Sequence, residues 1–557
     1  MDNYYGIDLD EKRKELLSSL KAKTFVDKVI SDADKAINEE VLALKMSDYL
    51  LFFKTGDRKK FQTGYYQRRN NCHALLFAYW LTEDEKYLEP LIDYVGYICD
   101  EYTWCLPAHI NINDIQSEMV MERIDLFHAE TARLFAEIVM CVGDKLPSYI
   151  LFRMKKEVER RVFPSLDRGY VYWWEDCKLN WATVCGSGCL LAALYFGDDN
   201  HKEAYVNRFQ KCLDTYLEQS KDGCSREGIL YWNYGFGHFV MLAQIIRIYT
   251  DGKIDYFKKP EVHEYARFLS RVTLSNSKTV AFSDAKENLS FNIALISFLI
   301  NEYDDILTPN LDFGTYVTSS NSMWSLLWFD VNFPEAKVDT SSHYYEDAQW
   351  YIKKTKTYSF AAKGGNNDEP HNHNDIGSFM LVYNDKVIVS DLGSGIYTRQ
   401  TFFPETRYDY IQNSSRGHSV PIINGKYQIA GAEYKAKNAK ATDNEFYLDI
   451  ESAYESGIIN RISRLFTFED NKVYLKDTFE FSDKTESITE RLVSKNVPEV
   501  TDNSVIIENT KLSFDSDKFK VKISKDTLID KEEIPVYIID FEPISDEKTF
   551  KLEITFA

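Results

Sequence analysis

The sequence contains no long apolar run, since nowhere do the roughly 18 consecutive apolar residues of a membrane span occur. Its first residues, Met1 to Tyr5, also lack the charged-then-apolar pattern of a secretory signal. We therefore expect no membrane partner. We expect a cytoplasmic location if this N-terminus is complete, and a secreted or periplasmic location if a signal peptide has been removed.

An excess of basic residues is also missing. Lys and Arg number 66 against 87 Asp and Glu, which gives a net charge of −21. A nucleic-acid partner is therefore not expected, because phosphate binding needs a broad basic surface. An acidic sugar polymer would need a local cationic groove, which can act because screening limits electrostatic range to about 8–10 Å.

Cysteine is absent after residue 224. The nine cysteines are odd in number and lie mostly within apolar stretches, so we interpret them as buried free thiols rather than a disulfide framework. Cys185 and Cys189 lack the Cys-x-x-Cys spacing of a zinc site, and no second pair follows them.

Apolar residues recur at helical spacing from about residue 12 to 305, for example over 73–81 and 127–139. Short polar breaks separate these stretches, and no strand pattern intervenes. Many antiparallel helices joined by short turns indicate stacked helical hairpins that close into a toroid or solenoid.

After about residue 340 the pattern changes to alternating segments and turns. Residues 379–383 and 386–390, joined by Asn384-Asp385, predict a β-hairpin. Similar segments continue to the C-terminus, which indicates a large antiparallel β-sandwich. We place a helical domain at 1–335 and a β domain at 336–557, with a possible small β subdomain at 500–557.

The densest polar cluster lies in this β-rich half. His371 and His373 would share one face of a strand, and Asp391 would close the neighbouring strand, so a converging His/Asp/His set suitable for zinc is geometrically reasonable. For any one histidine alone, hydrogen bonding in a surface turn is the simpler interpretation. In the helical half, Asn180 could be only a helix cap and Tyr231 only a core ring.

Five motifs occur in the order found in heparinase II/III-like polysaccharide lyases, and this resemblance spans roughly residues 60 to 430. They are Asn180-Trp181, Glu227-Gly-x-x-Tyr231-Trp-x-Tyr234-Gly, His371-x-His373-x-Asp375-x-Gly-Ser-Phe379, Asp391-x-Gly393 and Arg416-x-His418. The resemblance implies a multidomain α+β protein, with an (α/α) toroid followed by an antiparallel β-sandwich, that cleaves uronate polysaccharide by β-elimination.

The resemblance also implies roles for individual residues. Tyr231 corresponds to the catalytic tyrosine, with Tyr234 as its rival, and Asn180 and His371 to the groups that hold the uronate carboxyl. His373, Asp391 and His418 correspond to a structural zinc site. Ser419 departs from the asparagine that often follows the last histidine. Further expected substrate contacts, each with a purely structural alternative, are Arg68, Arg69, Trp104, His109, Arg123, Glu227, Tyr234 and Arg416.

The expected partner is thus an acidic polysaccharide or oligosaccharide, such as heparan sulfate, chondroitin sulfate or hyaluronan. Two alternatives remain open. A glycoside hydrolase would need two carboxylic acids about 5–10 Å apart, for which Glu227 and Asp375 are the candidates. A non-catalytic polysaccharide-binding protein could keep the fold without the chemistry.

Overall fold

The computed structural model describes residues 3–115, 117–288, 292–308, 322–337, 339–398 and 400–556. Helices dominate the first part of the chain and strands the rest, so the predicted fold class is confirmed. The last helix before the sheets ends at Leu327 and the first strand begins at Ser342, on either side of the predicted boundary at 335/336. Among the described helices, none is both long and apolar enough to cross a membrane.

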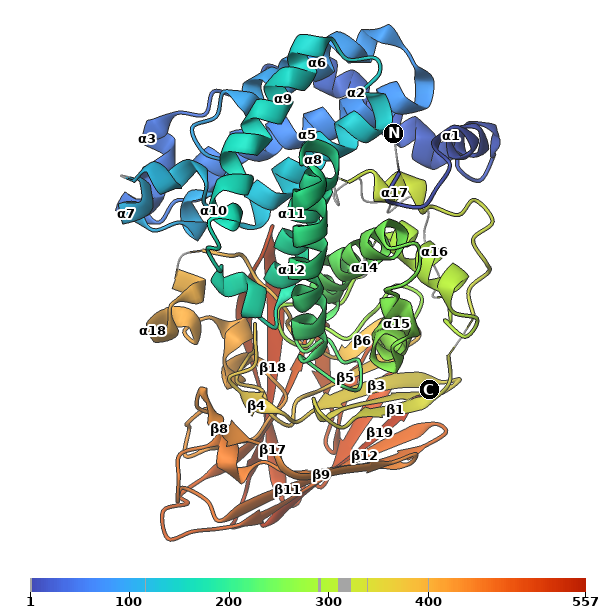
Figure 1. Cartoon of the computed structure of the whole chain (residues 1–557). Coiled ribbons are helices and arrows are strands. Elements are labelled where there is room, and N and C mark those ends of the chain that lie inside the picture. Colours follow the sequence, from blue (N-terminus) through green and yellow to red (C-terminus); the bar gives the residue numbers. More distant parts are fainter. Residues whose placement is uncertain are drawn as a thin grey trace.

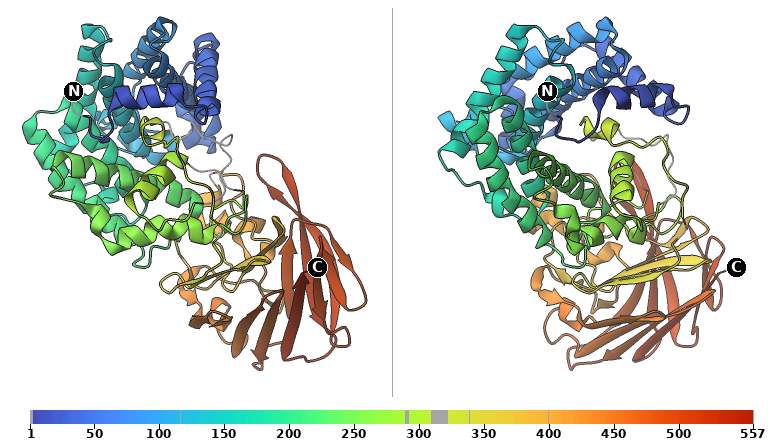
Figure 2. Two further views of the ribbon diagram at one scale, coloured as in Figure 1. Left: turned by 90° about the vertical axis from the view of Figure 1, so that its right-hand side faces the viewer. Right: turned by 45° about the vertical axis from the view of Figure 1, so that its right-hand side comes forward.

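The helices form an open arc of neighbouring pairs above the sheets (Figures 1 and 2). They are α1 (Leu9–Ser18), α2 (Lys23–Asn38), α3 (Met46–Tyr49), α4 (Leu51–Thr55), α5 (Lys59–Thr82), α6 (Leu88–Cys99), α7 (Ile112–Ile115), α8 (Leu126–Val142), α9 (Ser148–Arg161), α10 (Phe163–Asp167), α11 (Asn180–Phe196), α12 (Asp199–Leu217), α13 (Ile229–Tyr231), α14 (Gly237–Tyr249), α15 (Pro260–Val272), α16 (Ile293–Glu302) and α17 (Trp324–Leu327), with α18 (Pro404–Arg407) in the β-rich half.

Helices α8 and α11 illustrate how the sequence sets this packing. The Asp125 carboxylate accepts a hydrogen bond from the His128 backbone N–H at 2.7 Å and so caps α8. A Cβ at Gly188 of α11 would lie 2.3 Å from the Ala129 carbonyl oxygen. Glycine therefore permits the close approach of the two helices, which places the start of α11 at the edge of the cleft described below.

The strands form antiparallel sheets that share one sandwich. Their bounds are β1 (Ser342–Tyr345), β2 (Trp350–Lys354), β3 (Tyr358–Lys363), β4 (Asn366–Asn367), β5 (Phe379–Tyr383), β6 (Lys386–Val389), β7 (Ile422–Ile423), β8 (Gly431–Lys435), β9 (Lys437–Thr442), β10 (Glu445–Asp449), β11 (Arg461–Glu469), β12 (Lys472–Glu480), β13 (Ile488–Ser494), β14 (Pro498–Val500), β15 (Ser504–Ile507), β16 (Thr510–Phe514), β17 (Phe519–Ile529), β18 (Glu533–Pro543) and β19 (Thr549–Phe556).

A five-stranded sheet has the order β1-β2-β3-β5-β6, and an eight-stranded sheet has the order β14-β15-β16-β19-β12-β11-β10-β9. A four-stranded sheet, β17-β18-β13-β7, completes the sandwich with the pair β4-β8. Residues 500–557, predicted as a possible small subdomain, supply strands to the eight-stranded and four-stranded sheets, because β19 pairs with β12 and β18 with β13.

Both faces of the five-stranded sheet are buried. On one face, Phe360 packs against Phe466 of the eight-stranded sheet, with ring centroids 4.9 Å apart. On the other face, Trp350 packs against Phe282 of the helical half at 5.1 Å and belongs to the same apolar core as the helices. This shared core fixes the two halves against each other, so a site built from both can hold its geometry.

Candidate active site at the junction of the two halves

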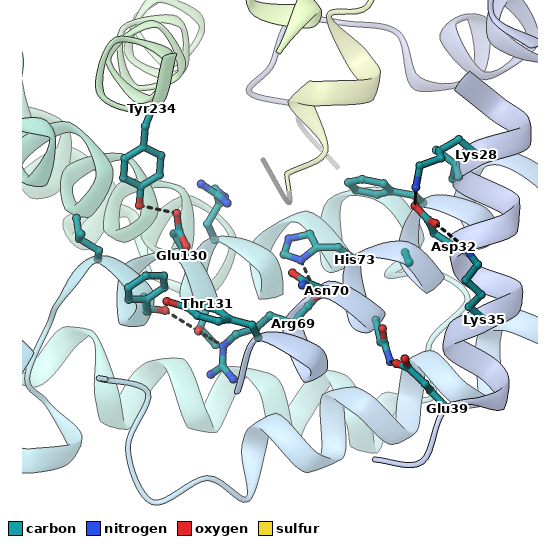
Figure 3. Close-up of a pocket in the computed structure, with 18 of the residues that line it drawn as sticks. Lys28, Asp32, Lys35, Glu39, Arg69, Asn70, His73, Glu130, Thr131 and Tyr234 are labelled. Carbon is teal, nitrogen blue, oxygen red and sulfur yellow. Dashed lines mark hydrogen bonds and ion pairs between the residues drawn. The ribbon is translucent and has the colours of Figure 1, made fainter. Parts of the chain in front are cut away.

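A cleft of about 960 Å³ runs along the inside of the helical arc. Figure 3 shows Lys28, Asp32 and Lys35 on one side of it, facing Glu130 and Tyr234 across the opening. The lining contains five basic side chains and three carboxylates, together with Asn180, Tyr231 and Tyr234. The lining therefore has more basic than acidic side chains, although Lys28 and Lys35 each pair with Asp32 and Arg69 pairs with Glu101. The basic side chains of this lining are Lys28, Lys35, Arg58, Arg69 and Arg133.

Tyr231 ends α13 and is followed by a π-helical turn, Trp232–Phe236, a feature often found at functional sites. Its ring stacks on the His371 imidazole, with centroids 4.1 Å apart and an interplanar angle of 25°. Its hydroxyl lies 3.2 Å from the Tyr397 hydroxyl. Burial raises the pKa of Tyr231 well above its usual value, so the free protein holds a neutral phenol here. The contact between these two rings thus joins the helical half to the β-rich half.

His371 and His373 do not lie in a strand, contrary to the predicted geometry. Both precede β5 in a loop, and His371 has a positive φ of 57°. They converge because Asp284, a residue of the helical half, contacts both. Its Oδ2 lies 2.7 Å from His371 Nδ1 and its Oδ1 lies 3.2 Å from His373 Nε2.

Asp284 is almost completely buried. Burial alone raises the pKa of this carboxyl, but the hydrogen bonds with the two imidazoles outweigh burial and hold the pKa well below its usual range. Asp284 is therefore an ionised carboxylate that connects the helical half to the loop that carries His371 and His373. Sequence reasoning missed it, because a single carboxylate between two turns carries no recognisable pattern.

His373, Asp391 and His418 are fully buried, and their potential ligand atoms all lie within 4.8 Å of one another. One atom of each is already occupied. His373 Nε2 contacts Asp284, His418 Nε2 lies 2.8 Å from the Gln412 carbonyl oxygen, and Asp391 Oδ1 accepts the Gly393 N–H at 3.0 Å. The structure thus brings the three predicted residues together, and contacts with neighbouring residues fix the orientation of each side chain.

The opposite atoms of these side chains, His373 Nδ1, His418 Nδ1 and Asp391 Oδ2, make no well-formed hydrogen bond among the described residues, although His418 Nδ1 lies 3.3 Å from Asp391 Oδ2. Buried polar atoms are rarely left in this state, because their desolvation is then uncompensated. Two imidazole nitrogens and a carboxylate oxygen, each steadied by a hydrogen bond on its other side, form a donor set that can hold a divalent metal ion.

Several other predicted residues lie at the cleft. Asn180 is the first residue of α11 and lines it. His109 and Tyr234 also line it, with His109 Nδ1 2.9 Å from an Asp125 oxygen and the Tyr234 hydroxyl donating to Glu130 at 2.8 Å. Arg69 lines the cleft too, although its guanidinium makes a bidentate pair with Glu101.

Four of the predicted contacts do not line the cleft. Arg68 pairs with Glu101, Arg123 donates to the Tyr170 hydroxyl, and Arg416 lies 3.4 Å from Asp526. Trp104 is fully buried and its indole N–H donates to a backbone carbonyl. We therefore withdraw the expected substrate contacts of the buried Arg68 and Trp104, whereas those of the partly exposed Arg123 and Arg416 stay predictions. Glu227 is buried next to His371, with 3.6 Å between Glu227 Oε1 and His371 Nε2.

No family model and no curated protein matches the sequence. Solved structures do match. The heparan sulfate lyase HepC from Pedobacter heparinus aligns with a TM-score of 0.61 at 13% identity, over 98% of this chain and 87% of that one. A heparinase III structure aligns with a TM-score of 0.64 at 14% identity, over 94% and 84%. The chain has the fold of these polysaccharide lyases.

The same lyase fold extends to a second kind of enzyme. Chondroitin AC lyase from Streptomyces coelicolor, solved in complex with chondroitin sulphate, aligns with a TM-score of 0.57 at 8% identity, over 98% of this chain and 82% of that one. All three matches span at least 94% of this chain, so they cover the helical arc and the sandwich together.

Within this lyase fold, Asp284→Asn should lower kcat by about 10- to 100-fold, the range typical of residues that orient a metal ligand. The neutral amide can no longer accept equally from both imidazoles, so His371 loses its fixed orientation, while KM should change little. A matched control is Asp305→Asn, which alters a surface carboxylate 2.6 Å from His263. Equal activity of Asp284→Asn and wild type in steady-state assays would contradict this role.

Burial raises the pKa of Glu227 to about 7. Because this value lies above that of an unfolded chain, the protonated carboxyl stabilises the fold at low pH, and the contribution is lost as pH rises through about 7. We expect Glu227→Gln to gain stability relative to wild type between about pH 5 and pH 8, by at most about 3 kcal/mol. Urea unfolding across this range tests it, with exposed Glu218→Gln as control. If the free energies of unfolding of wild type and Glu227→Gln depend on pH in the same way, the prediction is refuted.

Proposed function

We propose that the chain is a polysaccharide lyase that cleaves uronate-containing glycosaminoglycans, such as heparan sulfate, chondroitin sulfate or hyaluronan, by β-elimination. One observation carries this proposal. Tyr231 stacks on His371 at the end of a basic cleft that Asn180 also lines. A phenol, an imidazole and an amide are thus available to one bound sugar acid.

The chemistry explains why these three groups are needed. A uronate C5 proton becomes removable only when the adjacent carboxylate is stabilised, so that charge can spread into an enolate-like intermediate. Asn180 would donate an amide N–H and His371 an imidazole N–H to that carboxylate. Asp284, which holds His371 Nδ1, would keep the ring in place as charge develops.

Tyr231 would transfer protons at C5 and at the O4 leaving group. Because burial raises the pKa of this phenol, the free protein holds it protonated, which is the state that donation to O4 requires. The Tyr397 hydroxyl, which lies 3.2 Å from the Tyr231 hydroxyl, would be hydrogen-bonded to it before the transfer. The C5 proton points to opposite faces in glucuronate and iduronate. Which group acts as the base, Tyr231 or a histidine, therefore depends on the epimer that is bound.

Zinc is the metal we propose for His373, Asp391 and His418, because two imidazoles and a carboxylate suit it. Bound there, it would supply a structural cross-link between the loop before β5 and the segments after β6 and α18. The Asp284 bridge would then carry that rigidity to His371. Proton transfer is left to the side chains of the chain itself.

A glycoside hydrolase is disfavoured by the surroundings of its candidate acids. Asp375 is fully buried and pairs with Lys363 at 2.8 Å, whereas Glu227 lies beside His371. Neither arrangement suggests two carboxylic acids on opposite sides of one glycosidic bond.

The deciding experiment offers the purified chain heparan sulfate, chondroitin sulfate, hyaluronan and alginate. A lyase creates a 4,5-unsaturated uronate, so near-ultraviolet absorbance should rise with at least one polymer, and each new non-reducing end should be lighter by one water than a hydrolysis product. Products of hydrolytic mass without new absorbance would favour the hydrolase, and no product from any polymer would remove the lyase proposal.

A further inference from the structure

An aromatic series leads out of the cleft at the start of α11. His109 and Phe127 line the cleft and stack at 5.5 Å with an interplanar angle of 18°. Trp181, the residue after Asn180, packs against His109 at 5.0 Å, and Trp173 packs against Trp181 at 4.8 Å. Ring contacts therefore run without a break from the cleft wall to Trp173. We call Trp181 and Trp173 the aromatic track.

Trp173 ends this track at the protein surface, where 60% of the residue is exposed. Large aromatic side chains usually hide most of their apolar area, so a tryptophan exposed to this degree needs a reason. Trp181 supports one side of the indole, at an interplanar angle of 48°, and restricts its motion. The remaining face is thus held ready for a flat apolar partner, which lowers the entropy cost of binding.

We infer that the aromatic track is a sugar-stacking subsite outside the cleft, which binds a distant ring of the same polysaccharide chain whose uronate reaches Tyr231. This inference rests on the proposed function and adds to it a preference for long chains. The occupant is a pyranose ring, because its C–H face packs on an indole while its acidic groups stay in water.

Charge supports this choice of occupant. The net charge of the protein is −21, and the two carboxylates that follow Trp173 in the same 3-10 turn, Glu175 and Asp176, already pair with Arg208 and Lys211, which leaves neither cation for an anionic sugar group. An ionic subsite for a sulfate or carboxylate would be unfavourable there, whereas stacking depends little on charge. In a glycosaminoglycan, uronate alternates with hexosamine. A chain can therefore present its acidic ring to the basic cleft and a hexosamine face to Trp173.

The test compares fragment lengths in the full-length protein. Disaccharide to dodecasaccharide fragments of heparan sulfate, chondroitin sulfate and hyaluronan are titrated by calorimetry into Tyr231→Phe, so that chains stay intact, with and without Trp173→Ala. We expect Trp173→Ala to raise the Kd of dodecasaccharides about 10-fold, and that of disaccharides by less than about 2-fold. Trp173→Phe should restore part of the long-chain affinity.

Phe152→Ala is the matched control, because Phe152 is 63% exposed on α9 and lines neither the cleft nor the track. Equal effects of Trp173→Ala on short and long fragments, or no effect on either, would overturn the track. No binding of any fragment would overturn it as well. Length-dependent binding without unsaturated product would keep the track but refute the lyase, whereas cleavage with affinity independent of Trp173 would refute the track alone.

Discussion

Tyr231→Phe is expected to lower kcat by about 10²- to 10⁴-fold, the usual contribution of a general acid or base. The change removes one oxygen and leaves the ring that stacks on His371. The Tyr231 hydroxyl contacts the Tyr397 hydroxyl at 3.2 Å, and loss of this one contact should leave folding and substrate affinity nearly unaffected. Initial rates of unsaturated-uronate formation and calorimetric binding of the same polymer measure the two effects separately.

Tyr234→Phe is the matched control, since Tyr234 also lines the cleft but its hydroxyl is held by Glu130. Its loss of kcat should be below about tenfold, because it removes one hydrogen bond to Glu130 rather than the proton donor of the reaction. If Tyr231→Phe keeps its activity while Tyr234→Phe loses it, the two tyrosines have exchanged roles. If both remain active, neither phenol transfers the proton.

The fold could be predicted where local patterns agree with long-range packing. The 379–383 strand matches β5 residue for residue, because alternation and the Asn384-Asp385 turn specify the same hairpin. Both turn residues have positive φ, 48° and 59°, as a tight hairpin turn requires. The segment 500–557 was also correctly predicted to form strands. Some of its sheet partners lie far away in sequence, so its place in the eight-stranded and four-stranded sheets could not be predicted.

The candidate site was also only partly predictable from the sequence. Tyr231 and the His373, Asp391 and His418 trio lie in motifs, and the structure brings the trio together. Asp284 was missed because its role depends on two imidazoles nearly ninety residues away, about which local sequence says nothing. Tyr397 was missed for the same reason.

The withdrawn substrate contacts show the opposite error. Arginines and aromatic residues near polar turns were predicted to face substrate, but the sequence does not reveal internal partners. Arg68 finds Glu101, and Trp104 lies beneath the Arg161 guanidinium, whose carbon is 4.8 Å from the ring centroid. Such pairs form only after the helices pack, so an exposed role and a buried role look alike in the sequence.

Removal of the proposed zinc ion is expected both to destabilise the β-rich half and to inactivate the protein. His418→Ala deletes one ligand and leaves the Asp391 carboxylate buried without its nearest imidazole, 3.3 Å away. Loss of one partner from a buried charged pair costs about 3–5 kcal/mol. For a domain of this size, each kcal/mol corresponds to about 2–4 °C in Tm. Calorimetry should therefore show a fall of roughly 6 to 20 °C.

Elemental analysis and chelation test whether the proposed ion is present. Elemental analysis of the wild-type protein should find zinc, and a chelator should lower Tm toward that of His418→Ala, because an ion bound only by the folded state stabilises it. His201→Ala, which changes an exposed histidine paired with Asp167, should leave metal content and Tm unaltered. Activity should fall in step with metal content, since the Asp284 bridge connects His373 to His371. Full activity and unchanged Tm in metal-free protein would show that the buried trio holds its geometry without an ion.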